Sequence, residues 1–530
     1  MSLSPASLQV LISQLSGVAE EMSAVLRRAA YSPNIKERAD CSAAVFDPEG
    51  NLLAQAENIP VHLGSMPASV RAVIDRFGPG VGPGLEPGDQ VIVNDPFAGG
   101  THLNDITVVA PCLVGVGDEA GGAQLVGWVA TRAHHADVGG EAPGSMPADA
   151  VDIAQEGLRL APQLLTAEVR GRVMASSRTP AERAGDLDAQ VGADAVGVDR
   201  LAALAGAPFA EVVAHGERRM RAVLGALPDG TWHFADVIDS FGSGPGQQEP
   251  SVVTVAVTVA GEHVTFDFTG SQAQRRGNVN AVEAVTVSAV AFALRAALDP
   301  TLPANAGTMA PVTVIAPRGT IVNAEPPAAV GAGNVEVSQR VADVCFGALA
   351  QIEPGRVGAA SQGTMNNLLV GNDRWVYYET LAGGQGGRPP GAGGAGMNGV
   401  HTHMTNTRNT PIEALERAFP LRVRRLRLRR GSGGAGLNPG GEGIERDLEV
   451  LEAATLSLIT ERRASAPWGL EGGGPGAVGE NWLLPGGDEA RARSLGDKVT
   501  VELEAGDVVR ILTPGGGGWG PVSTAPGPPA

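Results

Sequence analysis

Residues 94–105 read NDPFAGGTHLND, and residues 132–146 read RAHHADVGGEAPGSM. Between glycine-rich turns, these two stretches hold five side chains of the types that bind metals: His102, Asp105, His134, His135 and Asp137. Nitrogen and carboxylate ligands without sulfur suit a divalent ion such as zinc or manganese. The pattern predicts a metal site, and an open coordination position there would permit hydrolysis.

The spacing within each stretch limits which of these side chains can face the same ion. His102 and Asp105 lie three residues apart behind a pair of glycines, so a tight turn would let both face one point, whereas an extended strand would separate them. The alternative is a turn-capping aspartate with a hydrogen-bonded histidine. His134 and His135 are adjacent and would point to opposite sides of a strand. We therefore expect one of them to bind the metal and the other to move protons or contact substrate.

A further carboxylate would complete four-coordination of such an ion. Asp40, Asp95 and Asp137 are the nearby candidates. Their spacing in the sequence does not choose among them.

The composition argues against several classes of protein. The 39 basic and 57 acidic residues give a formal net charge of −18, which disfavours a surface for nucleic acid or for an anionic membrane. The three cysteines are far apart and form no CxxC pair, so neither a disulfide framework nor a thiolate zinc site is indicated. Histidine is scarce, with 9 residues, so its concentration in the two quoted stretches is informative.

The N-terminus lacks a basic start followed by an apolar signal core. The longest mainly apolar run, 284–294, is about half a membrane span. We therefore expect a cytoplasmic protein without a membrane partner. Lysine occurs only as Lys36 and Lys498, and neither fits a phosphate loop of the form GxxxxGK(S/T). ATP consumed through such a loop would have to be bound by another chain.

Hydrophobic periodicity predicts an α+β protein, mixed α/β over most of its length with a β-rich C-terminal part. The predicted helices cover 8–30, 67–77, 186–204, 208–227, 282–298 and 335–352. The predicted strands cover 41–46, 52–55, 90–93, 106–109, 125–130, 252–259 and 263–267, and residues from 421 onward are mostly β. Both histidine clusters then lie at strand ends, where loops present side chains on a rigid frame.

We expect three domains. Residues 1–227 form the predicted metal-site domain, residues 228–420 a central α/β domain, and residues 421–530 a β-rich domain with a flexible tail.

Two polar motifs have competing interpretations. The run LRVRRLRLRR at 421–430 fits a strand with one charged face, bulged at Arg424-Arg425. On an acidic chain, a solvated or salt-bridged face is favoured there over nucleic-acid binding. Residues 401–409, HTHMTNTRN, fit the lining of a substrate pocket and an ordinary polar loop equally well.

Several blocks of the sequence occur together in one known family, and in the same order. They are NIKERADCSAAVFD (34–47), HLGSMPASV (62–70), the two stretches quoted first, DFTGSQAQRRGNVN (267–280), TNTRNTPIEALE (405–416) and TPGGGGWG (513–520). With these blocks the chain resembles, over nearly its whole length, the hydantoinase B/5-oxoprolinase family. That family comprises the B subunits of ATP-dependent hydantoinases and lactamases and is related to acetone carboxylase subunits.

The resemblance implies a division of labour between two subunits. A partner A subunit binds ATP and phosphorylates the amide oxygen of a small cyclic substrate such as a hydantoin, 5-oxoproline or a lactam. The B subunit holds a divalent metal, zinc or manganese in preference to magnesium, that activates water to open the ring. An A/B heterotetramer or a higher A/B oligomer is the expected assembly.

The resemblance also assigns residues. The family's metal ligands fall on Asp40, His102, Asp105 and His134, and Asp40 matches the aspartate of the ERxD block. His135 and Asp137 are expected to assist catalysis by orienting ligands or moving protons.

Two alternatives remain beside this hydrolase. One is a subunit of an acetone-carboxylase-like ligase, although such subunits tend to be longer than 530 residues. The other is a non-catalytic partner that stabilises the A subunit, against which the presence of all four implied ligands argues.

Overall fold

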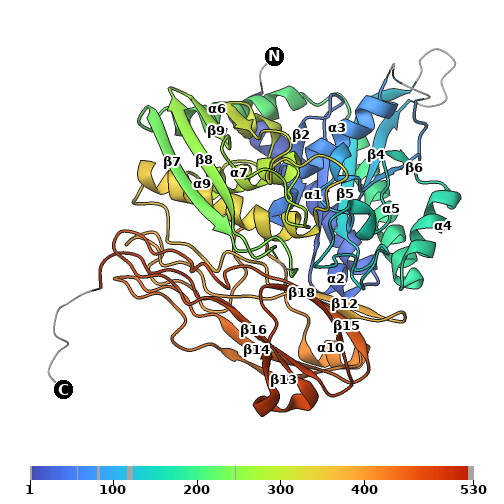
Figure 1. Ribbon diagram of the computed structural model, residues 1–530. Helices are drawn as coiled ribbons and strands as arrows, with labels where there is room; N and C mark the ends of the chain where they lie inside the picture. Colours follow the sequence, from blue (N-terminus) through green and yellow to red (C-terminus); the bar gives the residue numbers. More distant parts are fainter. Residues whose placement is uncertain are drawn as a thin grey trace.

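The computed structural model describes residues 3–522, apart from residues 57, 80, 82, 83, 116–122 and 245. The described residues contain ten α-helices and four β-sheets in a multi-domain mixed α/β arrangement, which confirms the predicted fold class (Figure 1). None of the helices described is long and apolar enough to span a bilayer.

The first sheet carries the two quoted stretches. It is six-stranded, in the order β2-β1-β5-β4-β3-β6, and antiparallel throughout. Its strands are β1 (Cys41–Phe46), β2 (Leu52–Ala56), β3 (Val91–Val93), β4 (Asp105–Val114), β5 (Gln124–His134) and β6 (Gln163–Leu164).

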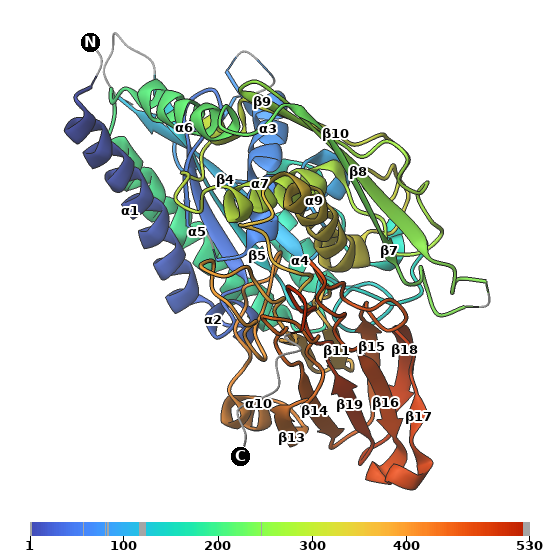
Figure 2. The same cartoon turned by 90° about the vertical axis from the view of Figure 1, so that its left-hand side faces the viewer.

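Helices cover both faces of this sheet, as the side view of Figure 2 shows. On one face lie α1 (Pro5–Ala29) and α5 (Pro180–Ala202), and on the other lies α3 (Ser65–Phe77). Alternate residues of β1 divide between these layers, since Ala43 and Val45 join the core under α1 while Ala44 and Phe46 join the core under α3. Apart from Ser42, the strand is therefore apolar and does not alternate with polar residues.

A second sheet lies beyond α3 and packs on two further helices. Its order is β10-β9-β8-β7, with β10 parallel to β9. These elements are β7 (Gly230–Ile238), β8 (Ser251–Ala260), β9 (His263–Asp267), β10 (Val312–Ile315), α7 (Glu283–Ala297) and α9 (Ser338–Ile352). A π-helical turn over Gly333–Val337 leads directly into α9. The remaining helices are α2 (Pro33–Lys36), α4 (Ala167–Ser176), α6 (Phe209–Leu224), α8 (Ala306–Met309) and α10 (Ile412–Ala418).

The C-terminal part is β-rich, as predicted, and lies at the bottom of Figure 1 in orange and red. Two sheets share one apolar core there. The first has the order β12-β11-β15-β18 and the second the order β13-β14-β19-β16-β17. Their strands are β11 (Asn367–Gly371), β12 (Val376–Thr380), β13 (Leu421–Leu428), β14 (Ile444–Val450), β15 (Ala454–Ile459), β16 (Glu480–Leu484), β17 (Arg493–Ser494), β18 (Lys498–Leu503) and β19 (Val508–Leu512).

The division into three domains at 227 and 420 stays a prediction. β11, which precedes residue 420, hydrogen-bonds to β15, which follows it, so one sheet draws strands from both sides of that boundary. The predicted flexible tail lies largely outside the described residues, which end at 522.

The arginine-rich run forms β13 and pairs with acidic residues of β14. The register of the two strands shifts between Val423 and Arg425, which places a bulge where the sequence predicts one. Arg424 binds Glu449 at 2.7 Å, and Arg427 binds Glu445 at 2.6 Å. The charged face is therefore salt-bridged within the sheet.

A buried ion-pair network joins the second sheet to the C-terminal part. Arg462 Nη2 lies 2.6 Å from Asp236 Oδ2 of β7 and 2.7 Å from Asp343 Oδ2 of α9. Lys498 Nζ lies 2.5 Å from Glu461 Oε1, and both side chains are fully buried. Each charge has an opposite partner, which burial in this interior requires.

Candidate metal centre

Three of the predicted ligands meet where β4 begins and β5 ends. In the antiparallel register, Asp105 lies directly opposite His134. Asp105 Oδ1 is 3.5 Å from His134 Nδ1 and 3.2 Å from His102 Nε2. One ligand atom of each of the three residues lies within 4.8 Å of the others, and all three are buried. We call His102, Asp105 and His134 the triad.

The glycines before His102 permit the turn that brings it back to Asp105. Gly99 has φ = 88°, and a Cβ there would collide with the backbone of Ala68. A Cβ on Gly100 would lie 2.7 Å from the carbonyl oxygen of Asp95. The chain can therefore fold tightly here only without side chains, and the tight-turn geometry expected from the sequence is the one observed.

The unpaired nitrogen atoms of the triad fit a cation. His102 Nδ1 and His134 Nε2 are buried without a hydrogen-bond partner among the described residues, and the polar neighbour of His102 Nε2 is the Asp105 carboxylate at 3.2 Å. Buried polar atoms in native proteins are nearly always satisfied, so such a cluster calls for a ligand. Two imidazoles and one carboxylate are a donor set that zinc and manganese accept.

The electrostatics favour the metal-binding protonation states of His134 and Asp105. Burial lowers the pKa of His134 to about 3, which leaves a neutral ring at neutral pH. Burial alone would raise the pKa of Asp105, but the histidines around the carboxylate outweigh it and hold the pKa well below its usual range. Neutral imidazole and ionised carboxylate are the forms that bind metal.

Asp40 lines the same small cavity as Asp105 and His134, whereas the other two candidate carboxylates do not line it. Burial raises its pKa to about 7, against the opposing effect of Arg38, whose Nη2 lies 4.0 Å from Asp40 Oδ2. Asp95 instead binds Arg159 at 2.8 Å. Asp40 is not part of the close triad, and its role as a fourth ligand stays a prediction.

His135 and Asp137 are buried just beyond the triad and make other contacts. His135, the first residue after β5, contacts α5 and not the triad, with its Nε2 2.9 Å from Gln190 Oε1. Asp137 accepts hydrogen bonds from Arg178 and from the backbone of Gly144. Neither residue lines the small cavity, and their assignment as catalytic stays a prediction.

Sequence reasoning missed His62, which lies on the far side of Asp105. His62 Nε2 is 3.5 Å from Asp105 Oδ2, and its Nδ1 lies 2.9 Å from Ser42 Oγ. A signal existed, because His62 is another of the 9 histidines and belongs to the HLGSMPASV block.

Two further neighbours come from distant parts of the chain. The Tyr378 ring of β12 stacks on His134 with centroids 4.5 Å apart. Asn334 lies in the π-helical turn and lines the cavity, and its Oδ1 is buried without a partner. π-turns are frequent at functional sites, but no periodicity in the sequence marks this one.

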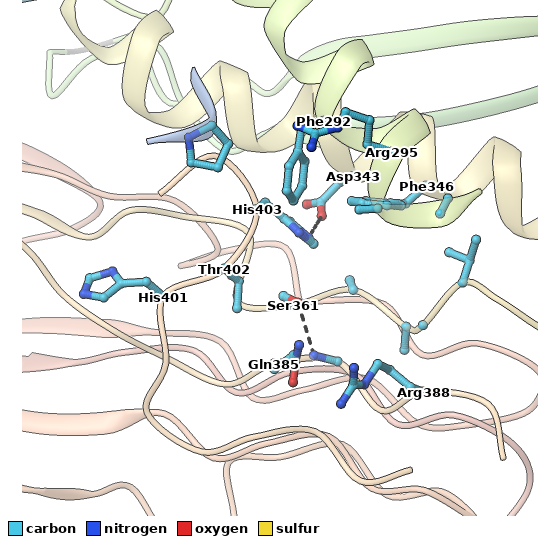
Figure 3. A pocket seen from close by; sticks show the side chains of 18 of the residues that line it. Phe292, Arg295, Asp343, Phe346, Ser361, Gln385, Arg388, His401, Thr402 and His403 are labelled. Carbon is cyan, nitrogen blue, oxygen red and sulfur yellow. Dashed lines mark hydrogen bonds and ion pairs between the residues drawn. The ribbon is translucent and has the colours of Figure 1, made fainter. Parts of the chain in front are cut away.

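The cavity beside the triad is small, and a larger one adjoins it. The small cavity has a volume of about 20 Å³, enough for one water molecule. The larger cavity has a volume of about 500 Å³ and lies between helices α7 and α9 and loops of the C-terminal half (Figure 3). The HTHMTNTRN segment lines both cavities, and Thr405 belongs to each.

Comparison with known proteins places the chain in a family. The family model described as hydantoinase B/oxoprolinase matches residues 4–522. The chain belongs to the hydantoinase B/oxoprolinase family. This confirms the resemblance on which the ligand assignments rest.

The relatives fall into two size classes. An uncharacterized protein of Methanocaldococcus jannaschii is 39% identical, with 97% of this chain and 90% of the relative covered. A 5-oxoprolinase of Arabidopsis thaliana is 37% identical over 95% of this chain, which spans only 41% of that relative. A protein of Pseudomonas sp., named as the B component of a D-/L-hydantoinase, is 30% identical, with 98% and 90% covered.

Two solved structures share the fold. An ATP-dependent caprolactamase from Pseudomonas jessenii superposes with a TM-score of 0.87 at 27% identity, with 98% of this chain and 92% of that chain covered. An acetone carboxylase superposes with a TM-score of 0.86 at 20% identity, with 97% and 76% covered. The second likeness shows the fold alone.

Proposed function

We propose that this chain is the metal-dependent hydrolytic subunit of an ATP-dependent enzyme that opens a cyclic amide. The substrate is a hydantoin, 5-oxoproline or a related lactam, phosphorylated first by an A-type partner subunit. The observation that carries the proposal is the buried triad of His102 and His134 around Asp105, whose pKa is held well below its usual range. The names of the 5-oxoprolinase, the hydantoinase component and the caprolactamase support the choice of a cyclic amide.

The triad, with Asp40 beside it, would hold zinc or manganese. When bound, such an ion lowers the pKa of water and polarises a substrate oxygen. His102 and His134 present nitrogen donors, and Asp105 supplies the negative charge between them. Thr101 Oγ1 donates to the second carboxylate oxygen of Asp105 at 2.5 Å, His62 Nε2 lies 3.5 Å from the same oxygen, and these contacts fix the orientation of that ligand.

Asn334 offers a hydrogen-bonding amide to whatever enters the small cavity. No hydrogen bond to either of its side-chain polar atoms is present among the described residues, although the residue is only 3% exposed. We propose that this amide hydrogen-bonds to the oxygen on which negative charge develops during ring opening, a role that asparagine fills in other hydrolases.

Asn334→Ala is expected to lower kcat by roughly 100-fold, the usual cost of removing one such donor. Bound metal, measured by elemental analysis, should remain at the wild-type level because the triad is intact. Asn278→Ala is the matched control, since Asn278 is equally buried but donates to Pro147 O away from the cavity. A wild-type kcat in Asn334→Ala would contradict the role.

The division of labour is tested by separating the subunits. The isolated chain is expected to hydrolyse no ATP, because Lys36 and Lys498 lie in no phosphate loop and Lys498 is buried against Glu461. Addition of the A-type subunit and a lactam should start ring opening coupled to ATP consumption. Steady ATP hydrolysis by the isolated chain would overturn this assignment.

The shared fold with acetone carboxylase favours one alternative, a carboxylase subunit. ATP consumption that depends on a ketone plus bicarbonate, and not on a lactam, would establish it. A non-catalytic stabilising role is the other alternative, and full turnover with metal-free protein would establish that.

We propose that the assembly is an A/B heterotetramer or a larger A/B oligomer. Light scattering of the mixed subunits measures its mass.

A further inference from the structure

We propose that the larger cavity binds a small ring compound that carries a negative charge. Its volume of about 500 Å³ is within the range of small-molecule sites. Figure 3 shows its two walls, with Phe292 and Phe346 above and Gln385 and Arg388 below. The two walls differ in chemistry, and each suits a different part of such a ligand.

The upper wall is aromatic. Phe292 and Phe346 meet edge to face, with centroids 5.8 Å apart and an interplanar angle of 88°. The His403 ring lies 5.0 Å from Phe346, and its Nε2 is held 3.2 Å from Asp343 Oδ1. Three rings fixed against each other form a surface on which a small ring can pack.

The lower wall contains an arginine without a counter-ion. The Arg388 guanidinium makes no hydrogen bond or ion pair with any described residue, and its Nε is buried. A Cβ on Gly393 would collide with this guanidinium, and Gly393 has φ = 124°. The backbone thus makes room for the charge without neutralising it. An arginine in such a position binds carboxylate or phosphate.

The other charges along the cavity do not cancel Arg388. Asp343 is the one carboxylate among the lining residues, and Arg340 and Arg462 already bind it at 2.8 and 2.7 Å. Arg356, another lining residue, donates to the carbonyl oxygen of Leu298 and pairs with Glu353 at 3.5 Å. These charges are already paired, so Arg388 keeps a positive charge at the lower wall, although the whole chain carries −18. A local field of this sign selects anions.

The position of the cavity connects it to the triad. Pro60 lines the larger cavity, while its neighbours Ile59 and Val61 line the small one, and Thr405 lines both. The small cavity is too small for a ring, so a cyclic substrate has to be held next door. This step rests on the proposed function. The anion is then either a carboxylate on the substrate or the phosphate added by the partner.

Calorimetric titration of the full chain tests the proposal with two anions, 5-oxoproline and inorganic phosphate. We expect wild type to bind at least one of them, and Arg388→Gln to bind it at least tenfold more weakly. Arg388→Lys keeps the charge but loses the planar guanidinium, so its affinity for the anion should lie between those of wild type and Arg388→Gln. Arg318→Gln is the matched control, because Arg318 is 79% exposed, pairs with Glu325 and lines neither cavity. It should bind as wild type does.

The outcomes separate the two sources of charge and the two proposals. Binding of 5-oxoproline alone identifies the substrate carboxylate, whereas binding of phosphate identifies the phosphoryl group. No binding by wild type, or equal binding by Arg388→Gln, overturns the inference. If ATP-dependent ring opening fails while the anion binds through Arg388, the proposed function falls and the anion site stands. If Arg388→Gln opens the ring with a wild-type KM, the anion site falls and the proposed function stands.

Discussion

Asp105→Ala is expected to strip metal from the purified chain and to abolish ring opening by the assembled complex, with the fold retained. Asp105 is the shared neighbour of His102 and His134, at 3.2 and 3.5 Å, so its loss removes a ligand and the charge that the ion neutralises. Elemental analysis should find about one equivalent of metal in wild type and none in the variant. Turnover should fall roughly 10,000-fold or more, as when an essential group is removed elsewhere. His102→Ala should behave alike.

Asp95→Asn is the matched control for that experiment. Asp95 lies in the same loop but binds Arg159, and an amide oxygen can still accept from the backbone of Phe97. This variant should keep wild-type metal content and turnover. Stoichiometric metal and full turnover in Asp105→Ala would show that the triad is not the metal site. Metal absent from wild type would show that the isolated chain does not hold the ion by itself.

Arg462→Leu is expected to destabilise the protein by about 3–5 kcal/mol, the usual cost of breaking a buried ion pair from one side. The change leaves Asp236 and Asp343, bound by Arg462 at 2.6 and 2.7 Å, to share the single remaining buried charge of Arg340, so one buried negative charge loses its partner. The midpoint of urea denaturation measures the loss. Because Arg462 joins the second sheet to the C-terminal part, the unfolding curve should also broaden as the two parts lose cooperativity.

A surface arginine provides the contrast. Arg424 binds Glu449 at 2.7 Å, yet its side chain is 52% exposed. Arg424→Ala should therefore leave the denaturation midpoint close to that of wild type, because exposed pairs contribute little. An equal loss of stability in the two variants would mean that burial does not determine how much each ion pair contributes to the free energy of unfolding.

The helices and strands of this chain could be predicted well because their patterns are local. The helix expected over 8–30 is observed at Pro5–Ala29, and the strand expected over 125–130 extends to His134. The extension matters, because it places His134 opposite Asp105 in the register. Strand ends depend on pairing with a neighbour, which composition does not reveal.

The candidate site likewise contains residues that local sequence could identify and residues that it could not. His102, Asp105 and the adjacent pair His134-His135 could be chosen from residue type and spacing, because turns and strand ends bring them together, but the choice of His134 over His135 required the family resemblance. Asp40 required the family resemblance, since nothing in the neighbouring sequence distinguishes it from Asp95. Tyr378 and Asn334 reach the cavity only through tertiary packing across about 200 residues of sequence or more, and no local pattern could identify them.

The stacking of Tyr378 on His134 has a consequence for the order in which the protein matures. Arg38 donates to the carbonyl oxygen of Tyr378 at 2.6 Å across 340 positions of the chain. During synthesis the histidines emerge long before the strand that covers them. The small cavity beside the triad is therefore closed only after β12 has been synthesised, and an ion held by the triad would be enclosed at that late stage.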